Sequence, residues 1–221
     1  MEKKYHIILA SNSPRRKELL AGLDVPFETR VIPGIDESYP ESLDAYQVAE
    51  YIAQKKAQAY GDLLAEGANQ MGGGDQAEGG NQAEADNLLV LTADTVVVAP
   101  AADEQNDQEG RGIILGKPHD AGEACRMLRM LSGKTHHVVT GVCLTTRQSQ
   151  RHFSVVTEVS FKQLTDAEIA YYVDRYKPLD KAGAYGIQEW IGYIGCTGLK
   201  GSYYNVMGLP VQRIYEEMEK M

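Results

Sequence analysis

Apolar and polar positions follow two patterns along this chain: short β-branched runs and longer stretches with helical spacing. The run LLVLTADTVVVAP, residues 88–100, is almost continuously apolar, which predicts a strand buried on both faces within an α/β layer. HHVVTGVCLTT and HFSVVTEVSFKQL alternate apolar with polar residues, as the two strands of an antiparallel pair do. The segment LPVQRIYEEMEKM has the apolar spacing of an amphipathic helix.

The other segments add strands and helices in alternation. YHIILA and FETRVI are expected as strands, and helices are expected from Pro14 to about Leu23 and from about Leu43 to Ala65. Two capping pairs mark further helix starts: Asp120 with Glu123, and Thr165 with Glu168. Mixed strands and helices with hairpins predict an α/β or α+β fold organised around a long mixed sheet.

One acid, Asp94, stands in the middle of the most apolar run. A carboxylate moved out of water costs several kcal/mol unless a cation, a hydrogen-bond donor or a metal ion compensates it. The sequence therefore predicts that the fold brings such a partner to Asp94.

Length and composition limit the class of protein. With 221 residues, 43% of them hydrophobic, the chain can form one domain with a substantial core, or two small lobes that share a cleft. No run of about 18 apolar residues and no secretory leader is present, so we expect a cytoplasmic protein. The three cysteines are far apart and without CxxC spacing, which favours reduced thiols over zinc ligands or disulfides. His136 and His137 are adjacent on a predicted strand, so one ring should be buried and the other exposed.

The net charge of −9 comes from one region of the chain. Residues 67–110 contain nine acids and no Lys or Arg, whereas the remaining 22 acids balance the 22 bases. Most of these acids lie in two segments rich in Gly, Ala, Gln and Asn, at about residues 67–87 and 101–110. Such compositions bury too little apolar surface to offset ordering, so we predict two flexible insertions on either side of the Asp94 strand.

The segment ASNSPRRKELL passes from a buried strand into a helix and can bind an anion. Pro14 suits the first helical position, and Ser13 can cap the helix. Free N–H groups there, the Ser11 and Ser13 hydroxyls, and Arg15 or Arg16 make a cradle for phosphate oxygens. The simpler alternative is an ordinary capped helix with solvated arginines. Neither a Walker A loop nor a GxGxxG fingerprint is present in the sequence.

Several charged residues are candidates for the same site. Lys117 and Lys181 lie in loops bounded by Gly or Pro, where functional groups are often presented, although each alone fits a surface lysine. Lys56 lies near the apolar stripe of a predicted helix and could snorkel at the core edge or reach into a cleft. Asp36 and Glu37 are either turn residues or carboxylates for a hard metal ion.

Eight blocks, in order along nearly the whole chain, resemble the Maf-type nucleoside triphosphate pyrophosphatases: LASNSPRRKELL, IDES, IAQKKA, TADTVV, GKP, LSGKTHHVVTGV, DKAGAYGIQ and GSYYNVMGLP. The resemblance implies a single Maf-like domain over residues 1–221. It also implies a long curved mixed sheet flanked by helices, with two lobes around a central cleft, and often a homodimer. The two acidic insertions depart from the shorter loops that are usual in the family.

The resemblance further implies a reaction and roles for individual residues. A nucleoside triphosphate is hydrolysed to its monophosphate and pyrophosphate with a divalent cation, Mg²⁺ or Mn²⁺. Asp94 would be the catalytic base and would hold the metal together with Glu37, while Arg15, Thr95 and Gln188 would select the substrate. The phosphate-binding residues would be Ser11, Ser13, Arg15, Arg16, Lys56, Lys117 and Lys181.

The base preference is expected to depend on Gln188. Its amide offers one donor and one acceptor, which complements N3–H and O4 of thymine or uracil, whereas the adjacent N–H donors of guanine suit a carboxylate better. The sequence DKAGAYGIQ also resembles the corresponding motif in the branch of the family that acts on dTTP and UTP. We therefore predict dTTP and UTP as the preferred substrates.

Two alternatives remain open from the sequence. The substrate could be 7-methyl-GTP or another modified nucleotide, or the protein could be a noncatalytic nucleotide-binding regulator of cell division, because the family is also linked to septum formation. An intact acid among basic motifs favours the enzyme, since a sensor needs no buried base. A nucleoside triphosphate is the expected partner, and neither a nucleic-acid polymer nor a membrane is expected.

Overall fold

The computed structural model describes residues 5–66, 87–101 and 112–221. The two predicted insertions, at about residues 67–87 and 101–110, lie almost entirely outside the described residues. None of the described helices is long and apolar enough to cross a membrane.

The described strands form one seven-stranded mixed sheet, in the order β2-β1-β3-β5-β6-β7, with β4 paired to β3. β1 is parallel to β2 and β3, and the other pairings are antiparallel. The strands are β1 (His6–Leu9), β2 (Phe27–Thr29), β3 (Leu88–Ala99), β4 (Ile113–Leu115), β5 (Thr135–Thr145), β6 (Gln150–Phe161) and β7 (Cys196–Lys200). The long mixed sheet and the antiparallel β5/β6 pair expected from the sequence are confirmed.

β3 is the strand that organises the site. On one edge it pairs with β5 continuously, from Val90 to Val98. On the other edge it pairs with β1 over residues 88–91 and with β4 over residues 97–99. The stretch between them, residues 92–96, has no partner strand on this edge within the described sheet, and Asp94 lies at its centre.

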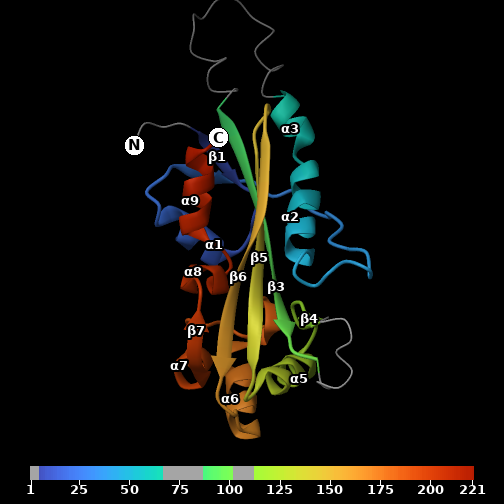
Figure 1. Cartoon of the computed structure of the whole chain (residues 1–221), viewed down its shortest axis with the longest axis vertical. Helices are drawn as coiled ribbons and strands as arrows, with labels where there is room; N and C mark the ends of the chain where they lie inside the picture. Colours follow the sequence, from blue (N-terminus) through green and yellow to red (C-terminus); the bar gives the residue numbers. More distant parts are fainter. Residues whose placement is uncertain (1–4, 67–86, 102–111) are drawn as a thin grey trace, which may run out of the picture.

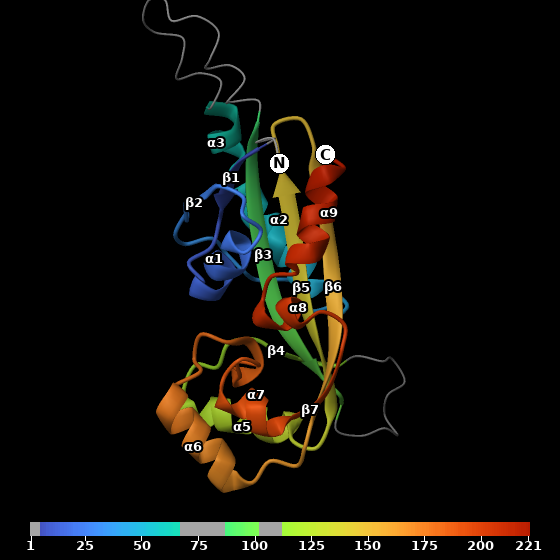
Figure 2. The same cartoon turned by 90° about the vertical axis from the view of Figure 1, so that its left-hand side faces the viewer.

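Helices cover the sheet as two lobes joined by the long strands β3, β5 and β6 (Figures 1 and 2). We call the end with β1, β2, α1, α2, α3 and α9 the first lobe, and the end with β4, α5, α6, α7 and the 3₁₀ turn η1 the second lobe. The helical elements are α1 (Pro14–Ala21), α2 (Val48–Gln58), α3 (Gly61–Glu66), α5 (Ala121–Leu131), α6 (Asp166–Tyr176), η1 (Ala182–Ala184), α7 (Trp190–Gly195), α8 (Tyr203–Met207) and α9 (Val211–Glu219). The expected two-lobed α/β architecture is therefore confirmed.

Each lobe has its own apolar core. In the first lobe, α1 and α9 pack on β1, β3 and β5 through residues such as Leu20 and Ile214. In the second lobe, α5, α6 and α7 enclose a separate cluster that includes Leu128, Ile169 and Ile191. Because these apolar clusters of the two lobes are separate, the lobes can enclose a polar cleft between them without exposing either cluster.

Two predicted elements have different boundaries in the structure. The helix expected from about Leu43 to Ala65 is two helices, α2 and α3, and starts only at Val48. The break lies at Tyr60, which is buried and donates its Oη–H to the carbonyl of Arg30, with the poor helix former Gly61 next to it. The strand expected in FETRVI ends at Thr29, because its partner β1 ends at the paired Leu9.

The local signals at helix ends and in the histidine pair are confirmed. Asp120 accepts a hydrogen bond from the Glu123 amide, and Thr165 and Glu168 form a reciprocal capping box. His136 is fully buried, and its Nε2 lies 2.8 Å from the Tyr185 hydroxyl, whereas His137 is partly exposed beside Tyr46. The three cysteines are free thiols, as expected.

We predict that stability falls in acid because of His136. Burial, helped by the neighbouring His137, lowers the pKa of His136 from 6.5 to about 4. The unfolded chain binds a proton near pH 6.5 that the folded chain does not, so stability should fall as the pH drops from about 6.5 to about 4. The free energy of unfolding should fall by about 3 kcal/mol in total.

Urea unfolding of wild type and His136→Gln across this pH range should show a flatter pH dependence in the variant. His119 is exposed, so His119→Gln should have the pH dependence of wild type. The same slope of unfolding free energy against pH in all three proteins would show that His136 is not the group responsible.

Candidate active site

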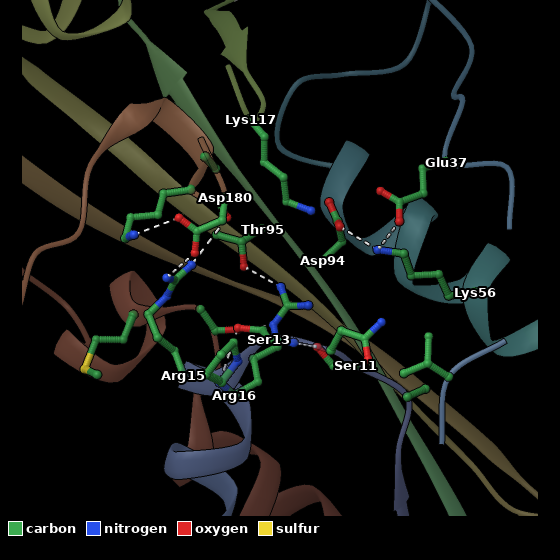
Figure 3. A pocket seen from close by; sticks show the side chains of 18 of the residues that line it. Ser11, Ser13, Arg15, Arg16, Glu37, Lys56, Asp94, Thr95, Lys117 and Asp180 are labelled. Carbon is green, nitrogen blue, oxygen red and sulfur yellow. Dashed lines mark hydrogen bonds and ion pairs between the residues drawn. The ribbon is translucent and has the colours of Figure 1, made fainter. Parts of the chain in front are cut away.

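A pocket of about 530 Å³ lies between the two lobes, beside the unpaired stretch of β3 (Figure 3). Five cationic and three acidic side chains line it, so its walls favour an anionic ligand. The structure brings together in this pocket every residue predicted for the site: Ser11, Ser13, Arg15, Arg16, Glu37, Lys56, Asp94, Thr95, Lys117, Lys181 and Gln188.

Lys56 is a partner of the kind expected for Asp94, for which the sequence left a cation, a hydrogen-bond donor or a metal ion open. Its Nζ lies 2.8 Å from Asp94 Oδ1 and 3.0 Å from Glu37 Oε1, so the ammonium group joins both carboxylates. The Lys56 and Asp94 side chains are 12% and 13% exposed, whereas Glu37 is 50% exposed. Asp94 is therefore a charge held at the inner wall of the pocket. Glu37, in the loop before α2, contacts the same ammonium group.

Asp36 lies outside the pocket lining, although it precedes Glu37. Its carboxylate accepts bonds from Lys55, from the Ser38 amide and from the Ser38 hydroxyl, and these donors hold the pKa of Asp36 below its usual range. Of the two sequence interpretations of Asp36, the structure shows the turn residue.

The first turn of α1 faces the pocket as the sequence predicted. Ser13 caps the helix by accepting from the Arg16 amide, and Ser11 Oγ accepts from the Ser13 amide at 3.2 Å. Ser11 is itself buried. The turn thus presents two hydroxyls and the start of a helix to the cleft, which are groups that suit phosphate oxygens.

Arg15 and Lys181 form ion pairs with acidic side chains of the second lobe. Arg15 NH1 lies 2.8 Å from Asp180 Oδ2, across the cleft between the lobes. Lys181 Nζ lies 2.7 Å from Asp180 Oδ1 and 3.1 Å from Glu189 Oε1, and Glu189 in turn accepts from the Tyr172 hydroxyl. Asp180 and Glu189 were missed by the sequence reasoning. Their only sequence signal was that each is the immediate neighbour of a predicted site residue.

Lys117 differs from the other cations of the pocket. Among the described residues Lys117 has no ion-pair or hydrogen-bond partner, and its ammonium group points into the cleft toward Asp94 (Figure 3). An exposed lysine of this kind can bind an anion without first giving up a protein partner.

Three further residues, Thr95, Arg16 and Gln188, line the pocket. Thr95 Oγ1 lies 3.0 Å from the Thr140 hydroxyl and accepts from Arg16 NH2. The guanidinium of Arg16 also donates to two backbone carbonyls, those of Ala93 and Gly208. Gln188 also lines the pocket, and its buried Oε1 has no hydrogen-bond partner among the described residues.

The donor chemistry of the pocket fits a divalent cation. Asp94 and Glu37 supply two carboxylates, and Mg²⁺ is commonly bound by one or two carboxylates together with substrate phosphates. The described residues contain no group of three or more His, Cys, Asp or Glu placed to hold a metal ion.

Comparison with known proteins identifies the family of this chain. A family model described as Maf-like protein matches residues 6–221. The dTTP/UTP pyrophosphatase of Phocaeicola vulgatus is 51% identical over 219 residues, covering 99% of this chain and 97% of that protein. Proteins of the same name from Bacteroides thetaiotaomicron (47% identity, 99% and 97% coverage) and Porphyromonas gingivalis (50%, 98% and 94%) are similar.

Among solved structures, a nucleoside-triphosphatase described as a dITP/XTP pyrophosphatase, from Mycobacterium abscessus, covers 97% of this chain and 94% of that chain. Its TM-score is 0.40 at 16% identity, a similarity too weak to inform the fold. The family assignment depends instead on the near full-length match and on relatives at about half identity. On that evidence the chain belongs to the Maf family.

Proposed function

We propose that the pocket between the lobes hydrolyses dTTP and UTP to the nucleoside monophosphate and pyrophosphate. The observation that carries the proposal is the Asp94 carboxylate, held at 2.8 Å by Lys56 on the inner wall of a pocket rich in cations. Relatives at 47–51% identity are named dTTP/UTP pyrophosphatase, which supports this substrate class.

In the proposed mechanism a water molecule attacks the α-phosphorus in line with the departing pyrophosphate. Asp94 accepts the proton of that water, since a positioned carboxylate can act as a general base. The rest of the catalysis is positioning and charge stabilisation, as is usual in phosphoryl transfer. The phosphates would be held by Ser11, Ser13, Arg15, Lys56, Lys117 and Lys181.

The ion pairs of Asp180 with Arg15 and Lys181 are expected to break when the substrate binds. Arg15 and Lys181 both contact its carboxylate, and a phosphate group offers the same two cations a more highly charged acceptor. The pairing keeps both side chains at the pocket wall while no substrate is present, which lowers the entropic cost of binding.

Asp94 and Glu37 are the residues that we propose to hold a divalent cation, Mg²⁺ or Mn²⁺. Such an ion neutralises phosphate charge and makes a bound water more acidic. Lys56, which contacts both carboxylates, would keep them at the same wall of the pocket and limit their mutual repulsion.

A nucleotide panel tests the function. Purified protein should release pyrophosphate from dTTP and UTP with Mg²⁺ and lose this activity with EDTA, and rates for purine nucleotides, 7-methyl-GTP included, should be lower. Preference for 7-methyl-GTP would overturn the substrate claim. Absence of turnover for every nucleotide, with or without metal, would favour a binding protein.

Gln188 is the residue that we propose to read the base. Its unpartnered Oε1 can accept the N3–H of thymine or uracil, while its amide N–H can donate to O4. Gln188→Glu should reduce kcat/KM for dTTP by at least about tenfold, because a lost hydrogen bond and a mispaired charge each cost about 1 to 3 kcal/mol. Steady-state kinetics will measure this, with Gln150→Glu on the exposed start of β6 as the matched control. A wild-type value of kcat/KM for dTTP in the Gln188→Glu variant would show that Gln188 does not recognise the base.

We also propose that residues 1–221 act as one domain. The support is that β3, β5 and β6 run through both lobes and that the pocket takes residues from each lobe. Neither lobe alone would then carry the activity.

A further inference from the structure

The stretch of β3 that carries Asp94 lacks a partner strand on the pocket side. β1 ends at Leu9, opposite Leu91, and β4 begins to pair only at Val97. Backbone groups on an unpaired strand edge need other partners, and without them the edge is free to move. Whatever holds this stretch therefore also sets where the Asp94 carboxylate lies.

Arg16 makes two contacts with this stretch of β3, one to a backbone carbonyl and one to a side-chain hydroxyl. Its NH1 donates to the carbonyl of Ala93 at 2.8 Å, and its NH2 donates to Thr95 Oγ1 at 3.0 Å, so it holds the residues before and after Asp94. Its Nε donates to the carbonyl of Gly208, at the end of α8, at 2.8 Å. One side chain from α1 thus ties the β3 edge to two other elements of the fold.

The chemistry of Arg16 differs from that of its neighbour Arg15. Arg15 contacts one residue, Asp180, through its carboxylate at 2.8 Å and its backbone carbonyl at 3.4 Å, and a phosphate group can replace the carboxylate. Each nitrogen of the Arg16 guanidinium donates to a protein oxygen, which uses three of its five N–H groups, and two of these oxygens are backbone carbonyls that cannot move aside. Turning Arg16 toward a phosphate would break bonds that hold the strand.

We propose that the main role of Arg16 is to position Asp94 by bonding to β3 where a partner strand is missing, at residues 92–96, rather than to bind phosphate. The inference deepens the proposed function and rests on it. Lysine cannot reproduce this role, because a single ammonium lacks the planar fork that reaches two acceptors on the strand and a third on α8.

The test compares Arg16→Lys with Arg15→Lys. A small misplacement of a catalytic group can cost about a hundredfold in rate, so Arg16→Lys should lower kcat for dTTP by about 10- to 100-fold. Its KM and its Kd for pyrophosphate, measured by calorimetry, should stay within about threefold of wild type, because the phosphate ligands are untouched. Arg15→Lys should show the reverse pattern, with KM and Kd raised and kcat less affected. Arg129→Lys, at an exposed pair with Asp166, controls for the substitution itself.

A double-mutant cycle separates positioning from general structural damage. If Arg16 acts through Asp94, adding Arg16→Lys to Asp94→Asn should cause no further loss in the residual rate. An equal loss in both backgrounds, or a Kd for pyrophosphate that rises tenfold with kcat unchanged, would overturn the inference.

A second variant covers the case in which Arg16→Lys fails to fold. Thr95→Val removes one of the three acceptors and should lower kcat by the same factor for dTTP and UTP, and Thr95→Ser should restore it. A change in KM or in base selectivity alone would contradict positioning. Wild-type turnover in the same assay tests the proposed function separately, and if it is absent the inference fails with it.

Discussion

Replacing Asp94 with Asn is expected to lower kcat for dTTP by about 10²- to 10⁴-fold, the usual contribution of a general base. The amide keeps the shape of the carboxylate but cannot accept a proton from water at neutral pH. Lys56 keeps its contact with Glu37, so the wall of the pocket should stay in place. Nucleotide binding is therefore expected to remain within about tenfold of wild type, since the cations that hold the phosphates are unchanged.

Asp36→Asn is the matched control for this prediction. The same chemical change is made in the loop beside Glu37, at a carboxylate outside the pocket that is 67% exposed. Its turnover should stay close to wild type. Stopped assays for kcat and nucleotide titration for Kd give the two quantities, and near-normal turnover by the Asp94 variant would remove Asp94 as the base.

The second large effect is expected from Gly141→Ala. Gly141 pairs with Asp94 across β3 and β5, and a Cβ there would lie 2.2 Å from the backbone C of Ala49 and N of Glu50. These are backbone atoms of α2, the helix that carries Lys56, so the helix would have to move away from the sheet. Overpacking of this kind costs about 1 to 3 kcal/mol or more. We expect a lower Tm together with reduced kcat.

The control for Gly141→Ala is Gly61→Ala, where no atom lies within 4 Å of the added Cβ. A strand normally tolerates Ala better than Gly, so without the close approach of α2 the Gly141 variant should be neutral or stabilised. Thermal melting and kcat of the two variants decide between these outcomes, and an unchanged Tm for Gly141→Ala would contradict the packing argument.

Much of the site could be predicted because its chemistry leaves local signals. Asp94 was conspicuous as a charge in an apolar strand, and burial required a cation, a hydrogen-bond donor or a metal ion, of which the structure shows the cation Lys56. Ser13 was predicted as a cap because capping depends on residues within one turn of helix. Hydrophobic periodicity similarly predicted the long strands, whose pattern extends over 11 or 12 residues.

The remaining features depend on contacts between residues far apart in the sequence. Arg15 meets Asp180 across 165 positions, and nothing in either local sequence indicates the other. The role of Arg16 depends on a gap between β1 and β4, which only the assembled sheet reveals. The break between α2 and α3 likewise follows from Tyr60 reaching the carbonyl of Arg30 in another segment.

The most direct test of the central claim is the position of the bond that water cleaves. When dTTP is hydrolysed in H₂¹⁸O with Mg²⁺, attack on the α-phosphorus should place one ¹⁸O atom in the phosphate of dTMP and none in pyrophosphate. Mass spectrometry of the two products reads this directly. Label in pyrophosphate, or release of dTDP and orthophosphate, would contradict the proposed reaction.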